Sequence, residues 1–259
     1  MSNLQFRTEA PRVWRVDPWM AGGVRHVFLG SVLDARDPEP DWFTRIGLYC
    51  NAPLNGVLLL NQIHSDLIEE MPGTDYLTRQ RGGHLPSADG WIVDRADLAK
   101  YELAVAIKTA DCFPVIVIDT KSTLSAVLHC GWKSSVLGIL PKALARLESG
   151  WGISPSRCQV ALGPGISREQ YPVGEDVAAE IEAASSGLCV NHKSLRPVIN
   201  EISGEICADV GSLLIRQAIS SGVRSENIVE SGICTYNSRD CFSHRRDAEM
   251  AGRQLTILA

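Results

Sequence analysis

Short runs of apolar and β-branched residues recur along most of the chain, separated by segments rich in Gly, Pro and polar residues. Runs of this kind are typical of strands buried in a sheet, whereas an amphipathic helix repeats its apolar residues every three or four positions. We therefore predict strands at residues 24–29, 57–63, 91–93, 103–109, 114–119, 124–129, 158–162 and 227–230.

Helical spacing of apolar residues marks three further segments. The first is predicted to begin after a cap at Ser134 or Ser135 and to end near Leu147, with Pro141 as a possible kink. The other two predicted helices span residues 204–219 and 175–184.

The predicted strands outnumber the predicted helices. A mixed sheet, or a pair of sheets covered by helices, fits this balance better than a regular alternation of strand and helix. With 259 residues and 45% hydrophobic content, the chain can bury a large core as one α/β domain or as two tightly packed halves. Residues 72–87 and 186–197 are predicted loops.

The net charge of −5 gives no general attraction to nucleic-acid phosphates or to anionic lipid. This balance favours a small-molecule substrate and argues against nucleic-acid and membrane partners. No apolar run approaches the length of a membrane span, and the first residues lack the apolar core of a signal peptide, so we expect a cytoplasmic protein. The eight cysteines are scattered, which favours reduced thiols. The oligomeric state stays open.

Three side chains that bind soft or borderline metals, His64, Cys112 and His129, each follow an apolar, strand-like run. Because strand ends can converge on one point, we expect these residues to meet. Two imidazoles and one thiolate leave the fourth tetrahedral position of a zinc ion open, as in a catalytic zinc site. A core histidine or a buried, unreactive cysteine is the competing interpretation, and no two of the three residues form a short ligand motif.

Other roles for the same residues are open. A thiolate beside an imidazole is an activated nucleophile, so Cys112 and His129 also form a candidate catalytic pair. Nucleophile and zinc ligand compete for one thiolate lone pair. The six histidines include none two positions apart, which argues against a trinuclear copper cluster, although a single copper ion is chemically possible at these ligands.

A set of motifs gives the chain a resemblance to the YfiH-type family, also called the laccase-domain or polyphenol oxidase family and described as a purine nucleoside phosphorylase. The resemblance runs from about Gly22 to the last residue. The motifs occur in the family's order at residues 61–64 (NQIH), 88–90 (ADG), 109–115 (TADCFPV), 129–133 (HCGWK), 162–166 (LGPGI), 171–174 (YPVG), 234–235 (CT) and 242–247 (FSHRRD).

The resemblance implies a single α/β domain over residues 1–259, with β-sheets sandwiched between helices and a likeness to the catalytic domain of cytotoxic necrotising factor. It implies a zinc ion held by His64, Cys112 and His129. The implied reactions are phosphorolysis of adenosine, inosine, guanosine and methylthioadenosine, and deamination of adenosine. The substrates are then a purine nucleoside and phosphate. Some family members are tied instead to the editing of a peptidoglycan precursor.

Four cations near these motifs are candidates for contact with phosphate or substrate. Phosphorolysis needs a cation beside the phosphate that attacks the anomeric carbon, and a donor that protonates the leaving purine. Solvated surface charge is an equally good interpretation of each cation, and two neighbouring arginines in an extended segment would point to opposite sides. The candidates are Lys108, Lys133, Arg245 and Arg246, of which Lys133 is also a candidate catalytic residue.

Two aspartates complete the predicted site. Asp111 precedes Cys112 and could act in catalysis by orienting a ligand or accepting a proton, although Asp at a strand end also forms turns. Asp89 reads as a turn residue from its own surroundings, and the family motif implies that it lines the substrate site.

The chain departs from the family pattern in segment 31–55 and at positions beside the motifs. Lys133 stands where Arg is common, Pro172 where an acidic residue is common, and His244 where an aromatic residue is common. These departures leave the predicted metal ligands unchanged and bear on substrate preference. Three alternatives stay open: a peptidoglycan-precursor amidase or Cys–His hydrolase, a copper-binding polyphenol oxidase, and a non-catalytic zinc-binding scaffold.

Overall fold

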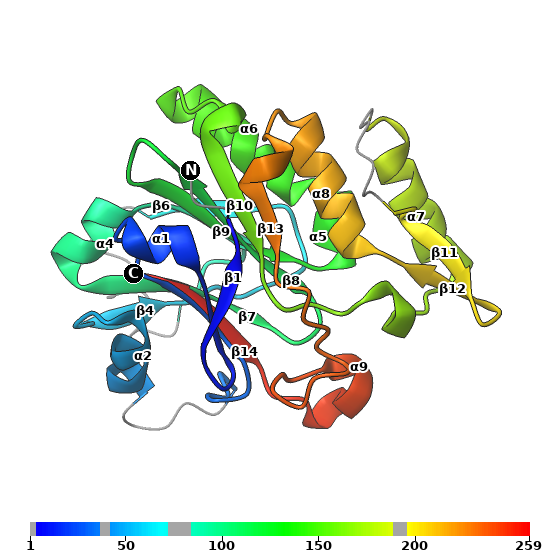
Figure 1. The fold of residues 1–259 in the computed structure, drawn as a ribbon, viewed down its shortest axis with the longest axis horizontal. Helices are drawn as coiled ribbons and strands as arrows, with labels where there is room; N and C mark the ends of the chain where they lie inside the picture. Colours follow the sequence, from blue (N-terminus) through cyan, green and yellow to red (C-terminus); the bar gives the residue numbers. More distant parts are fainter. Residues whose placement is uncertain (1–3, 37–41, 72–83, 189–195) are drawn as a thin grey trace.

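The computed structural model describes residues 4–36, 42–71, 84–188 and 196–259. These residues build two large β-sheets, one small hairpin and a set of helices (Figure 1). Among the helices described, none is both long enough and apolar enough to cross a membrane.

The first sheet gathers strands from distant parts of the chain. β14 lies inside this sheet, pairing antiparallel with β3 on one side and with β7 on the other, while β4 is a parallel neighbour of β7. In spatial order the strands are β1 (Phe6–Ala10), β2 (Val13–Val16), β3 (His26–Leu29), β14 (Gln254–Leu258), β7 (Leu103–Thr109) and β4 (Gly56–Leu58).

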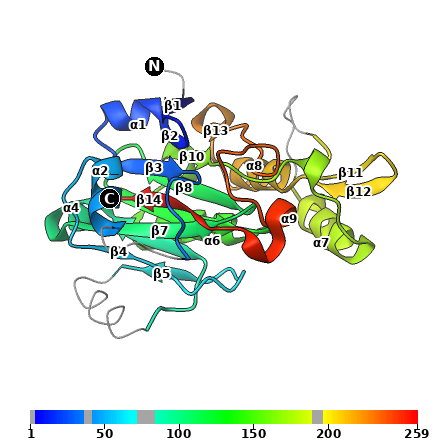
Figure 2. The same ribbon diagram turned by 90° about the horizontal axis from the view of Figure 1, so that it is seen from below.

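The second sheet has β8 and β9 as central antiparallel neighbours. In spatial order its strands are β13 (Ile228–Glu230), β10 (Cys158–Leu162), β8 (Phe113–Asp119), β9 (Leu124–Cys130), β6 (Gly90–Asp94) and β5 (Ile68–Glu70). A separate hairpin of β11 (Ile199–Ile202) and β12 (Glu205–Ala208) lies beside the helix α7 (Glu175–Ser186), at one end of the molecule (Figure 2).

Apolar side chains fill the space between the sheets and the outer face of each sheet. The core between the sheets contains Phe28 from the first and Val127 from the second. Helix α2 (Trp42–Cys50) covers the outer face of the first sheet, and α6 (Ile139–Trp151) and α8 (Val210–Ser220) cover that of the second (Figure 1). This layering confirms the predicted fold class, in which helices sandwich mixed β-sheets.

Shorter helices connect these layers. The sequence patterns did not predict α1, α4 or α9, because each is too short to show a helical repeat. The shorter helices are α1 (Asp17–Ala21), α4 (Arg95–Tyr101), α5 (Trp132–Val136) and α9 (His244–Asp247).

Most predicted strands are present, with different ends. The predicted strand 103–109 is β7 without change. The predicted strand 57–63 is reduced to β4, because the chain leaves the sheet after Leu58 and keeps only an isolated bridge between Asn61 and Ser87. The strands that were not predicted are β1, β2, β5, β11, β12 and β14.

The predicted helix 204–219 is wrong at its beginning. Residues 205–208 form β12, and α8 begins at Val210. The Asp209 carboxylate accepts a hydrogen bond of 2.8 Å from the Ser212 amide and so caps the helix. Ile206 fitted the helical repeat by spacing alone, although it belongs to the hairpin.

The predicted helix from Ser134 or Ser135 to Leu147 is two helices. Gly138, with a φ of 79°, separates α5 from α6 in a backbone conformation that disfavours residues with a side chain. Pro141 lies in the first turn of α6, where its missing N–H breaks no helical hydrogen bond, so it produces no kink. The segments 72–83 and 189–195, which hold most of the predicted loops, lie outside the described residues.

Gly163 marks a close approach between the two sheets. A Cβ atom at this position would overlap the ring of Phe28 and lie 2.8 Å from Pro114 Cγ. Close packing alone therefore explains why residue 163 is a glycine, and no role of the 163–165 turn in binding phosphate is needed to explain it.

We predict that Gly163→Ala lowers the free energy of unfolding by about 1–3 kcal/mol, because the added methyl group forces Phe28 or Pro114 to move. Urea denaturation measures the change. Gly150→Ala is a matched control, since it lies within α6 with open space around it and should stabilise the protein by about 0.5–1 kcal/mol. Equal stability of the Gly163→Ala and wild-type proteins would contradict this account of the packing.

Candidate metal centre

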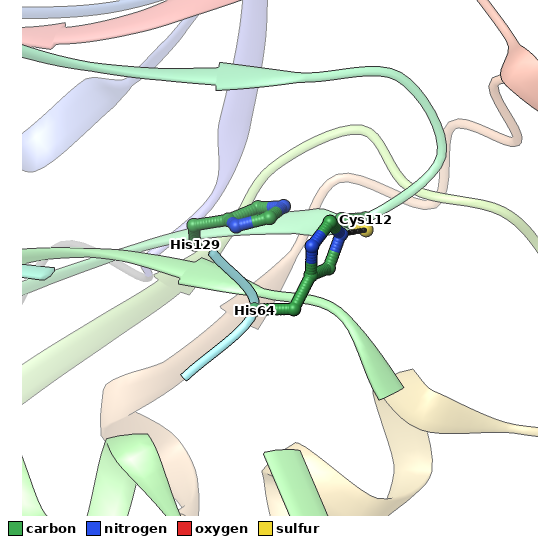
Figure 3. A group of neighbouring side chains, drawn as sticks. All are labelled: His64, Cys112 and His129. Atoms are coloured by element: carbon green, nitrogen blue, oxygen red, sulfur yellow. Dashed lines mark hydrogen bonds between the residues drawn. The ribbon is translucent and has the colours of Figure 1, made fainter. Parts of the chain in front are cut away.

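The structure brings His64, Cys112 and His129 together at one end of the two sheets (Figure 3). His64 lies on the segment that follows β4, Cys112 in the turn between β7 and β8, and His129 near the end of β9. Their metal-binding atoms all lie within 4.8 Å of one another, and Cys112 Sγ is 3.9 Å from His64 Nε2. Within the described part of the chain, this is the one group of three or more His, Cys, Asp or Glu side chains placed to hold a metal ion.

The donor set fits a tetrahedral metal ion with an open position. Bond lengths of zinc to sulfur and nitrogen place two ligand atoms roughly 3.3–3.5 Å apart, so small side-chain rotations suffice. Cys130, the next residue along β9 from His129, is fully buried in the apolar core on the other face of the second sheet. Burial raises its pKa well above the usual value, which leaves it a neutral packing residue.

Asp89 is buried and holds both histidines by hydrogen bonds. The family motif implies instead that it lines the substrate site. Its carboxylate accepts a hydrogen bond of 2.8 Å from His129 Nδ1 and one of 3.0 Å from the His64 amide. The amides of Ile63 and Ser65 and the Ser65 hydroxyl also donate to it. Because the side chain has no exposed surface, it cannot touch a substrate.

Hydrogen bonding keeps Asp89 ionised in its buried position. Burial alone would raise the pKa of this carboxyl, but the hydrogen bonds from His129 and Ser65 outweigh burial and lower the pKa to about 2. A charged carboxylate therefore orients His129 with Nδ1 protonated and leaves Nε2 for the cluster. Such support is common behind histidine ligands of metals.

Cys112 and His129 stabilise each other's charged forms when no metal is bound. Burial alone would raise the pKa of Cys112, but His129 and His64 lower it to about 6. Burial also disfavours charge on His129, yet the Cys112 thiolate and Asp89 raise its pKa to about 9. The metal-free pair is thus a thiolate and an imidazolium between about pH 6 and about pH 9.

Asp111 holds the C-terminal part of the chain against the Cys112 turn. Its φ of 86° is in the left-handed region, and its carboxylate accepts hydrogen bonds of 2.6 Å from the Thr235 hydroxyl and from the Arg245 amide. With only 8% of its surface exposed and both oxygens engaged, Asp111 acts as a positioning residue and as the turn residue that its sequence context allowed.

The two neighbouring arginines point to different places, although they lie in a helix rather than in an extended segment. Arg246 donates to the carbonyls of Thr235, Tyr236, Ser238 and Cys241 and pairs with Asp247, so its guanidinium holds the 235–241 loop. These contacts occupy the groups that were expected to bind substrate.

Arg245 and Lys133 are two further candidates for contact with phosphate, but each lies over an aromatic ring instead. The Arg245 guanidinium lies 5.0 Å from the centre of the Tyr171 ring and donates to the Pro172 carbonyl at 2.8 Å. Lys133 is exposed on α5, with Nζ 5.5 Å from the centre of the Trp132 ring. Trp132 lines a cavity of only about 30 Å³ beside Cys112, which suits packing rather than stacking on a purine.

A pocket of about 750 Å³ opens onto the cluster, and Lys108 is the predicted cation that lines it. A volume of this order can hold a small ligand of nucleoside size. The other eight lining residues had no role assigned from the sequence, and four of them have side chains with a clear bearing on the site. Gln62 was visible in the NQIH motif, and His244 in the FSHRRD motif, whereas Arg36 and Arg253 lie outside any motif. The pocket is lined by Ala35, Arg36, Asn61, Gln62, His64, Lys108, Thr109, Ala110, Cys112, His129, His244 and Arg253.

We predict that the metal-free protein has one thiol with a pKa near 6, that of Cys112. A pH titration of thiolate ultraviolet absorbance in chelator-treated protein measures this value. In the His129→Ala variant the pKa of Cys112 should rise to the ordinary thiol value of about 8.5 or above it, because the stabilising cation is gone and burial disfavours the thiolate. Cys112→Ser should lack the transition, while burial keeps Cys50 and Cys158 silent with a pKa of about 12. A transition near pH 6 that persists in Cys112→Ser would assign it to another thiol.

We further predict one divalent metal ion, zinc, per chain, and weaker metal binding by Gly131→Ala. A Cβ at Gly131 would lie 2.9 Å from Cys112 Sγ and 3.0 Å from His64 Cδ2, so the added methyl group pushes the ligands out of place. The expected loss of affinity is about 10-fold or more. Elemental analysis and competition with a chelator measure both quantities.

The metal experiment has two controls, one expected to bind metal normally and one expected to bind none. Gly150→Ala, in open space on α6, should bind metal like the wild type. A variant with His64, Cys112 and His129 all changed to Ala should bind none. One equivalent of metal retained in this triple variant would place the ligands elsewhere.

Comparison with known proteins agrees with this architecture. A purine nucleoside phosphorylase of Deinococcus radiodurans is 30% identical over 243 residues, covering 92% of this chain and 85% of its own. The adenosine deaminase RL5, from an unknown prokaryotic organism, is 29% identical over 60% of this chain and 57% of its own.

Solved structures show the same fold. The hypothetical protein YfiH of Bacillus licheniformis superposes with a TM-score of 0.82 at 23% identity, over 98% of both chains. YlmD of Geobacillus stearothermophilus superposes with a TM-score of 0.82 at 21% identity, over 100% of this chain and 99% of its own. Residues 43–259 match the family described as multi-copper polyphenol oxidoreductase laccase. The chain therefore belongs to this YfiH-type laccase-domain family.

Proposed function

We propose that this chain is a zinc-dependent purine nucleoside phosphorylase, acting on adenosine, inosine, guanosine and methylthioadenosine, with adenosine deamination as a second activity. The observation that carries the proposal is the open His64, Cys112 and His129 cluster on the wall of a nucleoside-sized pocket. The names of relatives that cover most of the chain give the reaction class. The chain would act as a cytoplasmic enzyme on small molecules.

The three ligands fit zinc better than a multi-copper centre. Zinc bound there supplies a Lewis acid with one open coordination position. A trinuclear copper cluster needs many more imidazoles, and within the described residues only one three-ligand group is present. The polyphenol oxidase alternative is therefore confined to a single copper ion at the same ligands.

Phosphorolysis needs two kinds of side chain from the protein: a cation beside the attacking phosphate and a proton donor for the leaving purine. A phosphate oxygen attacks the anomeric carbon of the ribose, the bond from that carbon to the purine nitrogen breaks, and the purine leaves with the bonding electrons and takes up a proton. His244 lines the pocket, and its Nδ1 lies 3.1 Å from the Ala248 carbonyl, which fixes the ring. We assign proton donation to the purine to the His244 ring.

Asp89, Asp111 and Gln62 position the pocket wall in this scheme. Asp89 orients His129, Asp111 fixes the turn of Cys112, and Gln62 joins the His64 segment to β7 through both polar atoms of the Lys108 backbone. None of the three has to exchange a proton with substrate. Deamination would use the same pocket with water in place of phosphate.

A second candidate function rests on the metal-free Cys112 and His129 pair. A thiolate held beside an imidazolium is the arrangement of a cysteine hydrolase, so an amidase acting on a peptidoglycan precursor is the competing enzyme class. The two functions respond to metal in opposite ways, because zinc and an electrophilic substrate compete for one sulfur lone pair.

We predict that adenosine with phosphate yields adenine and ribose 1-phosphate, and that adenosine without phosphate yields inosine more slowly. Chromatography of the products measures both reactions. A chelator should abolish turnover, zinc should restore it, and melting temperature should change little, since none of the three ligands belongs to the apolar core clusters. Hydrolysis of a peptidoglycan-precursor amide that increases after chelation would favour the cysteine hydrolase. Absence of conversion of adenosine, inosine and guanosine under all conditions, with zinc bound, would refute the proposed function.

A further inference from the structure

We propose that Lys108 and Arg253 form a subsite for inorganic phosphate in the 750 Å³ pocket beside the metal cluster. The proposal rests on the proposed function, because it assigns the position of the attacking phosphate. Arg253 had no part in any motif, and Lys108 was only one of four candidate cations, so the subsite emerges from the pairing of strands in the fold.

The pairing of β7 with β14 brings the two cations to the same end of the first sheet. Lys108 lies directly opposite Leu255 of β14, and Arg253 immediately precedes that strand. Two long cationic side chains that line one pocket can both reach a single anion. Both residues line the pocket.

Lys108 is fixed at the backbone rather than at its charged end. The Gln62 side chain donates to the Lys108 carbonyl at 2.8 Å and accepts from the Lys108 amide at 2.9 Å. Gln62 is also two residues from His64, so the same segment positions the metal ligand and the cation. A phosphate on Lys108 would therefore lie in the pocket that the cluster faces.

The positive charges of the pair are uncompensated within the described structure. No carboxylate is among the described residues that line the pocket, and only burial and the charge of Arg253 act on the Lys108 ammonium there. The Arg253 guanidinium donates to the carbonyls of Ala251 and Gly252, at 2.8 and 2.9 Å, whereas the contact of this residue with the Asp34 carboxylate is made by its backbone amide, at 2.9 Å. Burial and the charge of Arg253 both lower the pKa of Lys108, as expected for two cations held together without an anion.

Arg36 has a different place in the pocket. Its guanidinium is 3.2 Å from the Asp34 carboxylate and donates to the carbonyls of Glu249 and Met250. Its charge is thus largely balanced, and it supports the C-terminal segment that carries Arg253. The free charge in the described lining belongs to Lys108 and Arg253.

The chemistry of the pair suits a phosphate. Arg offers a planar fork for two phosphate oxygens, and Lys adds a mobile point charge. Thr109, which follows Lys108 in the chain and also lines the pocket, has a buried hydroxyl without a hydrogen-bond partner among the described residues. When phosphate attacks the anomeric carbon, the pair holds the nucleophile in position and offsets its charge. These contacts exist before and during the reaction, so their loss raises the KM for phosphate.

The test compares Lys108→Met, Lys108→Arg and Arg253→Met in the zinc-loaded protein. Each Met variant should raise the phosphate KM of nucleoside phosphorolysis by about 10- to 100-fold, as expected for the loss of a charge-assisted contact. Lys108→Arg should recover most of the affinity because it keeps the charge. Lys121→Met, which removes an exposed lysine between β8 and β9, is the matched control.

Direct calorimetric binding of inorganic phosphate, without nucleoside, separates this proposal from the proposed function. Binding that the wild type shows and both Met variants lose, in protein that keeps its zinc and melting temperature, supports the subsite even if no nucleoside is converted. Phosphorolysis with an unchanged phosphate KM in both folded Met variants overturns the subsite and leaves the proposed function standing. If Lys108→Met does not fold, the same two outcomes are read from Arg253→Met, whose residue lies outside the paired strand.

Discussion

A single buried carboxylate connects the two histidines of the cluster, which reach it from distant parts of the sequence. Asp89 accepts from the His129 ring and from consecutive amides of the turn that carries His64. His64 has a φ of 58°, a conformation that residues with a side chain rarely adopt. The hydrogen bonds from these amides to Asp89 hold the backbone in that conformation. Because hydrogen bonds to a charged group contribute about 1.5–3 kcal/mol each, the anion can offset that strain. One charge thus sets a ring orientation and a backbone turn together.

The Asp89 carboxylate also contributes to the net charge of the metal-free cluster. Without metal, Asp89 and Cys112 are two negative charges around one imidazolium, His129, so the cluster has a net negative charge and attracts a cation. His129, Cys112 and His64 would hold a divalent ion there in place of the ring proton of His129, with the hydrogen bond from Nδ1 to Asp89 kept. The sulfur then serves as a ligand. The arrangement that activates a nucleophile in the metal-free protein is therefore also a good receptor for zinc.

The sequence indicated the layered fold and the convergence of three strand ends, because both follow from apolar runs and the residues that end them. It could not indicate partners that only three-dimensional pairing creates. Asp89 was expected to line the site, since nothing in its motif shows whether a carboxylate faces solvent or a buried ring. Arg246 was predicted to contact substrate, because its motif does not show that its guanidinium binds the carbonyls of the 235–241 loop. Lys108 and Arg253 are 145 positions apart, and their proximity depends on β14, a strand that the pattern of the chain had not revealed.

The position of β14 has a consequence for how the protein is made. This strand lies between β3 and β7, so until residues 254–258 have left the ribosome the first sheet has a gap in its interior. Asp111 likewise lacks its partners until Thr235 and Arg245, more than 120 positions later, have been made. Pairings of such long sequence separation form late and slowly. The pocket therefore cannot be complete until β14 has been made and has paired with both of its neighbours.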